Sequence, residues 1–194
     1  MKRFLPALIL LLVVLLTVVF YFLNSKSKYD SSVLAINEES YLQKRSKESN
    51  LRLSGSKIAD EICIDSSGKG FPLSMLIKDT TLIFYFSEFH CNVCYEEEIR
   101  FIQSCFTDNS SPVMIICWYE SDTGFKNFSD KNQIQRPIYR IEHELIDLKF
   151  DNFGYPYYFL LHPDLIVSDI YIPDKNSPDM NKQYLERIKK LLSE

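Results

Sequence analysis

Two cysteines separated by two residues are the groups in this sequence whose spacing points most clearly to chemistry. Cys91 and Cys94 follow an apolar run over residues 81–86 and precede a segment whose apolar residues keep helical spacing. A strand that leads into such a pair at the start of a helix places both thiols near the positive end of the helix dipole. Unpaired backbone N–H groups there favour a thiolate and lower the thiol pKa, which suits dithiol–disulfide exchange.

Cys91 is predicted to be the nucleophile and Cys94 the resolving thiol. The amino-terminal thiol of such a pair is the more exposed one, because the helix that begins there covers the other. A thiolate at Cys91 would attack a substrate disulfide to form a mixed disulfide, and Cys94, one helical turn later, would resolve it. Two other interpretations stay open, namely a disulfide that only staples the fold and half of a zinc site.

A zinc site would need two further ligands, and none stands at a suitable spacing. The remaining histidines and cysteines are scattered along the sequence: His90, His143, His162, Cys63, Cys105 and Cys117. The last three lie in apolar surroundings, where unpaired cysteines behave as small hydrophobic residues. We therefore expect no metal and no cofactor. Five cysteines in 194 residues are also too few for a disulfide scaffold.

The charged residues beside the pair have two interpretations each. A cationic imidazole at His90 would stabilise the thiolate of the next residue, and a solvated loop position would also accommodate this histidine. Glu96, Glu97 and Glu98 follow the second cysteine, where acidic side chains interact favourably with the helix dipole. The same carboxylates would raise the pKa of a nearby thiol.

Residues 4–23 form an apolar run without a charged residue, and Lys2 and Arg3 precede it. About 20 residues at a rise of 1.5 Å are long enough to span a bilayer. No small-residue cleavage motif follows, so residues 1–23 are predicted to be an uncleaved signal anchor rather than a cleaved signal peptide. We expect a single-pass protein of the cell membrane whose domain lies on the extracytoplasmic, periplasmic side, where disulfides persist.

The rest of the chain divides by composition into two parts. Residues 24–54 are rich in Ser, Lys, Glu and Asn and are predicted to be a polar tether. Residues 55–194 are predicted to form the folded domain. The formal net charge is −4 and no basic stripe is present, so a nucleic-acid partner is not expected.

The domain is predicted to alternate strands with helices and to end in an antiparallel hairpin. Strands are expected near residues 58–64, 81–86, 113–119, 137–139, 157–161 and 165–172. Helices are expected after the second cysteine, over 120–132, over 142–150 and from 178 onward. This order indicates an α/β fold with a central mixed sheet and helices on both faces.

The sequence from residue 55 onward resembles the thioredoxin-like fold, in particular its membrane-tethered TlpA/ResA-like branch. The resemblance rests on the turn over residues 65–69, the segment 73–76, the cysteine pair, a glutamate three residues after it and a proline before an apolar strand. It implies a membrane-anchored thiol–disulfide oxidoreductase that reduces disulfides of exported proteins with electrons from a membrane relay.

The resemblance also implies roles for individual residues. Glu97 would relay a proton from Cys94 during resolution. Pro156 would follow a cis peptide bond, so that Tyr155 and Pro156 dock an extended substrate beside the nucleophile. The alternative function is a non-catalytic binding or assembly module on the same fold, with the cysteine pair as a structural disulfide. A peroxiredoxin is disfavoured, because the proline that its active-site loop requires is absent.

Overall fold

The computed structural model describes residues 15–21, 41–108, 111–143 and 154–193. The chain divides into two compact units, Met1–Tyr41 and Leu42–Glu194. Residues 15–21 of the first unit are helical and belong to the apolar run 4–23, whose other residues lie outside the described part. Within the described ranges, no helix is long and apolar enough to cross a membrane. The predicted anchor therefore stays a prediction.

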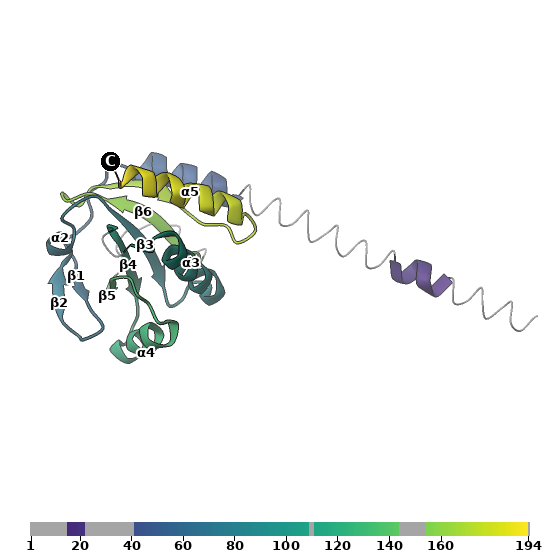
Figure 1. Ribbon diagram of the computed structural model, residues 1–194, viewed down its shortest axis with the longest axis horizontal. Helices are drawn as coiled ribbons and strands as arrows, with labels where there is room; N and C mark the ends of the chain where they lie inside the picture. The colour runs from purple at the N-terminus through teal and green to yellow at the C-terminus, as the bar shows by residue number, and fades with distance from the viewer. Residues whose placement is uncertain (1–14, 22–40, 109–110, 144–153, 194) are drawn as a thin grey trace, which may run out of the picture. The chain divides into compact units, whose positions relative to one another are not determined.

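One sheet of seven strands forms the centre of the second unit (Figure 1). The strands are β1 (Ile62–Ile64), β2 (Gly70–Pro72), β3 (Thr81–Ser87), β4 (Val113–Trp118), β5 (Ile138–Ile141), β6 (Tyr157–Leu161) and β7 (Val167–Tyr171). Their order across the sheet is β2-β1-β5-β4-β3-β6-β7. β3, β4 and β5 run parallel, whereas the pairs β1–β2, β1–β5, β3–β6 and β6–β7 are antiparallel. The predicted mixed sheet is confirmed.

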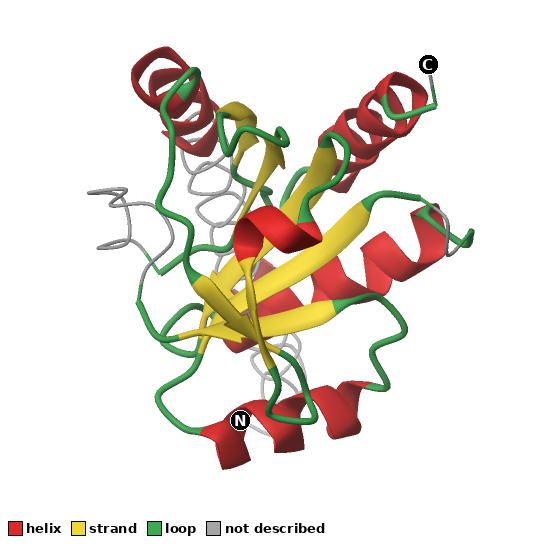
Figure 2. Cartoon of the chain, turned by 90° about the vertical axis from the view of Figure 1, so that its left-hand side faces the viewer, coloured by secondary structure: helices red, strands yellow, loops and turns green. Residues whose placement is uncertain are grey.

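The helices pack on both faces of this sheet (Figure 2). They are α2 (Leu73–Leu76), α3 (Asn92–Cys105), α4 (Asp122–Asn132) and α5 (Pro178–Leu191). All seven residues of β3 are buried, and its side chains alternate between two apolar cores. Phe84 and Phe86 join the core under α3, α4 and α5, whereas Ile83 and Tyr85 join the core that contains Leu73 of α2.

Residues 41–53 form a further helix that bonds to the edge strand β7. The side-chain amide of Asn50 donates to the carbonyl oxygen of Ile170 at 2.5 Å, and its Oδ1 accepts from the N–H of Ile170 at 2.6 Å. The Ser46 hydroxyl accepts from the N–H of Ile172 at 2.9 Å. The helix thus satisfies backbone groups that an open sheet edge would leave unpaired.

The predicted boundary between tether and domain lies too late in the chain. The compact unit begins at Leu42 rather than at residue 55. Leu42 is buried and Leu53 packs against the second core. The segment resembles a tether in composition because serine and asparagine side chains make its hydrogen bonds to the sheet, between these two leucines. The part of the predicted tether over residues 24–40 lies outside the described residues.

The remaining elements follow the prediction with shifted bounds. The strand expected over residues 58–64 is present as β1, which is only three residues long. β2 pairs with it. The predicted hairpin near the carboxyl end is present as β6 and β7. The helix expected over residues 142–150 falls mostly on residues 144–153, which the structure does not describe.

Candidate active site

β3 delivers the cysteine pair to the start of α3, as predicted. Ser87 ends the strand, a turn follows, and Cys91 is the N-cap residue of the helix. The carbonyl oxygen of Cys91 accepts from the N–H of Tyr95 at 3.2 Å, which closes the first turn. The Cys91 thiol therefore belongs to the helix terminus where unpaired N–H groups and the helix dipole stabilise a negative charge.

Cys91 and Cys94 form a disulfide in this structure, with their Cα atoms 5.3 Å apart. The two side chains differ in exposure, because Cys91 is exposed and Cys94 is only 8% exposed. An incoming sulfur atom can reach Cys91, whereas α3 covers Cys94. This asymmetry agrees with the predicted roles of nucleophile and resolving thiol.

The three glutamates after the pair lie beyond the first turn of α3, which contains no acidic residue. Their repulsion of a thiolate at the helix start is weaker than a first-turn position would give. Glu96 forms an ion pair with Lys131 of α4 at 3.4 Å. Glu97 is exposed, and its role as a proton relay stays a prediction.

Glu98 is the buried carboxyl group of α3, and the sequence-based assignment passed over it in favour of Glu97. Its Oε2 accepts from the Tyr158 hydroxyl at 2.5 Å, and its Oε1 accepts from the side-chain amide of Asn181 at 2.9 Å. These bonds tie α3 to β6 and to α5. Glu98 follows Cys94 by four residues, so both face the same side of the helix. That spacing is the sequence signal that could have identified it.

Burial raises the pKa of Glu98 to about 7. The hydrogen bonds from Tyr158 and Asn181 lower the pKa, but they do not offset the loss of hydration. Burial, and secondarily the Glu98 carboxylate, raises the pKa of the Tyr158 hydroxyl well above its ordinary value. The tyrosine therefore stays protonated and donates to Glu98, while Glu98 itself titrates near neutral pH.

His90 lies in the buried turn before the nucleophile. Its Nδ1 accepts from the backbone N–H of Ser87 at 3.2 Å, and its ring packs edge-on against Tyr85. His90 is thus buried rather than in a solvated loop position. Its predicted role in stabilising the thiolate stays a prediction.

The segment before β6 contacts the nucleophile, as predicted, but through a different residue. The N–H of Cys91 donates to the carbonyl oxygen of Gly154 at 2.9 Å. Gly154 has a φ of +65°, which favours glycine at this position. Tyr155 is half-buried and Pro156 is buried. The sequence prediction had not included Gly154.

The predicted cis bond before Pro156 is not present. The residues that the structure describes contain no cis peptide bond, so Pro156 follows a trans bond. The left-handed conformation of Gly154 turns the chain beside Cys91, so a trans proline suffices to bring this segment to the cysteine pair. Substrate docking by Tyr155 and Pro156 stays a prediction.

The three other cysteines are unpaired and lie in the protein interior or at its margin. Cys63 and Cys117 are fully buried, and Cys105 is half-buried. Burial raises the pKa of the Cys63 thiol to about 12, and it raises the pKa values of Cys105 and Cys117 as well. Thiols in this state are poor nucleophiles. Across the described ranges, no group of three or more His, Cys, Asp or Glu residues could hold a metal ion.

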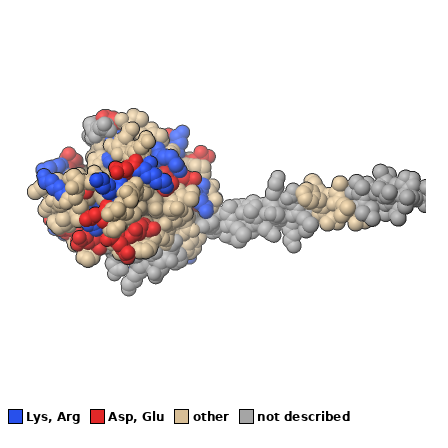
Figure 3. Space-filling model, turned by 90° about the horizontal axis from the view of Figure 1, so that it is seen from below, with Lys and Arg blue, Asp and Glu red and all other residues tan. Residues whose placement is uncertain are grey.

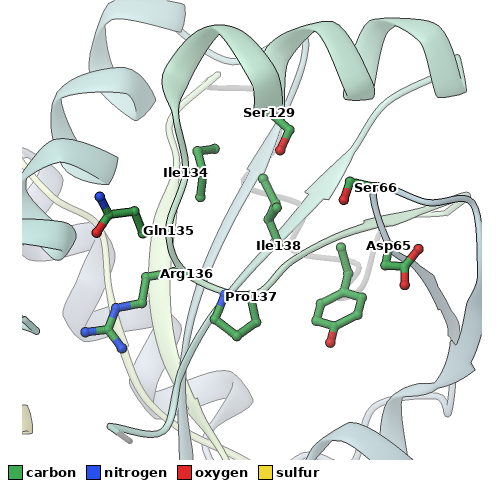
Figure 4. Close-up of a pocket in the computed structure, with 9 residues that line it drawn as sticks. Asp65, Ser66, Ser129, Ile134, Gln135, Arg136, Pro137 and Ile138 are labelled. Carbon is green, nitrogen blue, oxygen red and sulfur yellow. The ribbon is translucent and has the colours of Figure 1, made fainter. Parts of the chain in front are cut away.

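A pocket of about 490 Å³ lies away from the cysteine pair. It adjoins the amino-terminal end of β5, whereas Cys91 follows the carboxyl end of the parallel strand β3. Arg136 lines it, but its side chain extends away from Asp65 and Ser66 on the other side (Figure 4). The terminal nitrogens of Arg136 are buried, so a ligand in the pocket does not reach them. This pocket is not part of the redox site.

Several solved structures share this arrangement of strands and helices. A thiol:disulfide interchange protein from Bacteroides sp. has a TM-score of 0.50 at 13% identity, over 69% of this chain and 90% of that one. A putative protein disulfide isomerase from Bacteroides thetaiotaomicron has a TM-score of 0.52 at 17% identity, over 73% and 91%. A putative electron transfer protein from Aquifex aeolicus VF5 has a TM-score of 0.52 at 15% identity, over 68% and 92%.

These similarities establish the fold. No family model matches the chain, and no curated protein matches it either. The mixed sheet, the flanking helices and the Cys-x-x-Cys pair at the start of α3 form a thioredoxin-like fold, as the sequence resemblance predicted.

Proposed function

We propose that this protein is a membrane-anchored thiol–disulfide oxidoreductase that reduces disulfides of exported proteins. The observation that carries the proposal is the position of the Cys91–Cys94 disulfide, with an exposed sulfur at the N-cap of α3 and a buried sulfur one turn later. A helix N-terminus lowers the pKa of a thiol there and makes it a nucleophile near neutral pH. The similar structures named as thiol:disulfide interchange and disulfide isomerase proteins support this proposal.

The reaction transfers two electrons and two protons from the protein dithiol to the substrate disulfide. The Cys91 thiolate attacks one substrate sulfur, the substrate S–S bond breaks, and one substrate thiolate leaves and takes up a proton. The Cys94 thiolate then attacks Cys91 Sγ, which releases the second substrate thiol and forms the Cys91–Cys94 disulfide. The structure shows this oxidised product state. A membrane electron relay that supplies dithiol equivalents would return it to the dithiol.

Reduction of insulin disulfides with a small dithiol as electron donor tests the activity. We expect the Cys91→Ser variant to lose catalysis and to match the rate of the donor alone. Cys105→Ser is the matched control, because this cysteine lies outside the pair and its loss leaves the nucleophile intact. Full activity of Cys91→Ser would reject the proposal and favour a binding or assembly module with a structural disulfide.

The membrane location is a separate part of the proposal and rests on the uncharged run over residues 4–23. Cells that produce the full chain should retain it in membranes after alkaline extraction, whereas a chain without residues 1–23 should be extracted.

After reduction of intact cells, a membrane-impermeant alkylating reagent should label Cys91 if the domain is extracytoplasmic. Labelling only after cell lysis would contradict that placement.

A further inference from the structure

Exposed apolar side chains stand close in sequence to the exposed sulfur of the candidate active site. Phe89, two residues before Cys91, is 63% exposed, and Val93 inside the pair is 55% exposed. The Phe89 ring lies 5.4 Å from the ring of Trp118, which is half-buried. We call Phe89, Val93 and Trp118 the apolar rim. Apolar groups of this size next to a reactive sulfur offer a partner a surface to cover.

Two carboxylates adjoin this rim. The N–H of Glu88 donates to the carbonyl oxygen of Trp118 at 3.0 Å, and the N–H of Glu120 donates to Glu88 Oε1 at 2.6 Å. Glu88 is half-buried and Glu120 is exposed. The Glu88 carboxylate is therefore held near Trp118 by its bond from the Glu120 N–H, and the exposed Glu120 follows Trp118 by two residues, within the contact area of a partner that covers the rim.

The acidic character continues along the carboxyl ends of the parallel strands. Asp122 and Glu142 are exposed and lie 2.6 and 3.9 Å from the guanidinium of Arg140, which is buried. The group thus contains four carboxylates, with Glu88 and Glu120, and one guanidinium. Figure 3 shows one face of the domain, on which both acidic and basic side chains occur. Among the described residues of this group, carboxylates therefore outnumber cations four to one.

We propose that the polypeptide substrates of this site carry lysine or arginine residues next to the cysteine that Cys91 attacks. The inference rests on the proposed function and names the substrate class of the same site. Positive residues would be attracted by Glu88 and Glu120 as the partner approaches, and their apolar stems would pack on the rim. A cationic group over the Phe89 or Trp118 ring adds a cation–π attraction.

Peptide disulfides of matched sequence test the proposal. Each is a symmetric dimer of a short peptide whose single cysteine is flanked on both sides by lysine, by glutamine or by glutamate. The reduced protein is mixed with each dimer, and the rate constant is measured at low and at high salt. Flanking charges also change the pKa of the peptide thiol that leaves. The rate constant of each peptide dimer with the protein is therefore divided by the rate constant of the same dimer with dithiothreitol, which has no charged side group.

We expect the normalised rate to be about tenfold higher for the lysine peptide than for the glutamine peptide at low salt, and the glutamate peptide to be slowest. High salt should reduce this preference to about twofold, because exposed charges are screened. Glu88→Gln and Glu120→Gln should each lower the preference about two- to threefold at low salt. Glutamine at position 88 keeps the oxygen that accepts from the N–H of residue 120.

Glu186→Gln is the matched control, since it removes one negative charge from α5 near the far end of α3. It should leave the lysine preference unchanged. Equal normalised rates for the three peptides at low salt would overturn the inference, provided that they exceed the rates of a Cys91→Ser variant. If the wild-type protein reduces none of the three peptides faster than the Cys91→Ser variant does, the proposed function itself is wrong.

Discussion

Cys91 and Cys94 belong to one disulfide but occupy different environments. Cys91 is exposed at the helix N-cap, and Cys94 is buried beneath the first turn of α3. Only the exposed sulfur can meet the sulfur of a folded or extended polypeptide. The order of events in disulfide exchange therefore follows from exposure as well as from thiol pKa.

Cys94→Ala should accumulate a covalent complex with a disulfide substrate, because no thiol remains to resolve the mixed disulfide at Cys91. Mass spectrometry of the mixture without reductant should find the protein joined to one substrate chain through Cys91. Cys91→Ala should form no such complex, since Cys94 is covered. A complex of equal yield through Cys94 would show that the roles are exchanged.

Glu98 is a further residue whose environment determines its chemistry. Its folded-state pKa of about 7 lies above its ordinary value of 4.5, so the folded protein binds this proton more tightly than the unfolded chain does. The resulting stabilisation is fully present below pH 4.5 and is lost as the pH rises to about 7. Above that pH, the folded protein holds a buried carboxylate that Tyr158 and Asn181 satisfy only in part.

Glu98→Gln should remove this pH dependence. Between about pH 5 and pH 8, the free energy of unfolding of the wild-type protein should fall relative to that of the variant by roughly 2–3 kcal/mol. Urea titrations of the two oxidised proteins at several pH values measure the difference. Glu97→Gln is the control, because this side chain is exposed. Parallel pH profiles for wild type and Glu98→Gln would contradict the assignment of a raised pKa.

At the scale of elements, the helix over residues 41–53 protects the exposed edge of the sheet. β7 is the last strand of the sheet, and Asn50 satisfies both the N–H and the carbonyl group of its residue Ile170. An amide side chain can do this because it carries a donor and an acceptor, as a neighbouring strand does. The helix therefore replaces the next strand at this position.

Asn50→Ala should destabilise the domain by about 1–3 kcal/mol, because two backbone groups of the edge strand lose their partner. Lys47→Ala on the exposed side of the same helix should change the free energy of unfolding by less than about 0.5 kcal/mol. Chemical denaturation of the two variants provides the comparison. Equal effects would indicate that the bonds of Asn50 contribute nothing specific.

The elements that position the cysteines were predictable because their signals are local. The uninterrupted apolar run of β3 predicted a central strand, and the following apolar spacing predicted α3. The helix over residues 41–53 was not predictable as part of the domain, since Ser46 and Asn50 bond to the sheet between only two attached leucines, Leu42 and Leu53, and a continuous apolar stripe is absent. Likewise, the contact of Gly154 with Cys91 depends on a backbone conformation that composition does not reveal.

The sequence-based assignment also favoured Glu97 over Glu98, which is the buried carboxyl group of α3. Three consecutive glutamates look equivalent in the sequence, and the resemblance favoured the one three residues after Cys94. Burial distinguishes them, because only Glu98 faces β6 and α5. Tertiary packing, which joins residues 98, 158 and 181, buries Glu98 and thereby raises its pKa, and the sequence does not show this packing.

At the scale of the whole molecule, the five cysteines of this thioredoxin-like domain divide into one disulfide with an exposed sulfur and three unpaired thiols that are buried or half-buried. The exposed sulfur of Cys91 is close in sequence to Phe89 and Val93 of the apolar rim and to Glu88. The unpaired thiols have pKa values raised by burial. Redox chemistry should therefore be confined to one position on the folded protein.

The redox equilibrium with glutathione shows whether the Cys91–Cys94 disulfide is redox-active or only structural. The folded protein is equilibrated in buffers of increasing reduced-to-oxidised glutathione ratio, trapped by alkylation and analysed by mass spectrometry. We predict a reversible two-electron transition that involves only Cys91 and Cys94, with the same midpoint from the oxidised and the reduced side. A disulfide that stays oxidised throughout the series, as structural disulfides with potentials below about −300 mV do, would contradict a redox-active pair.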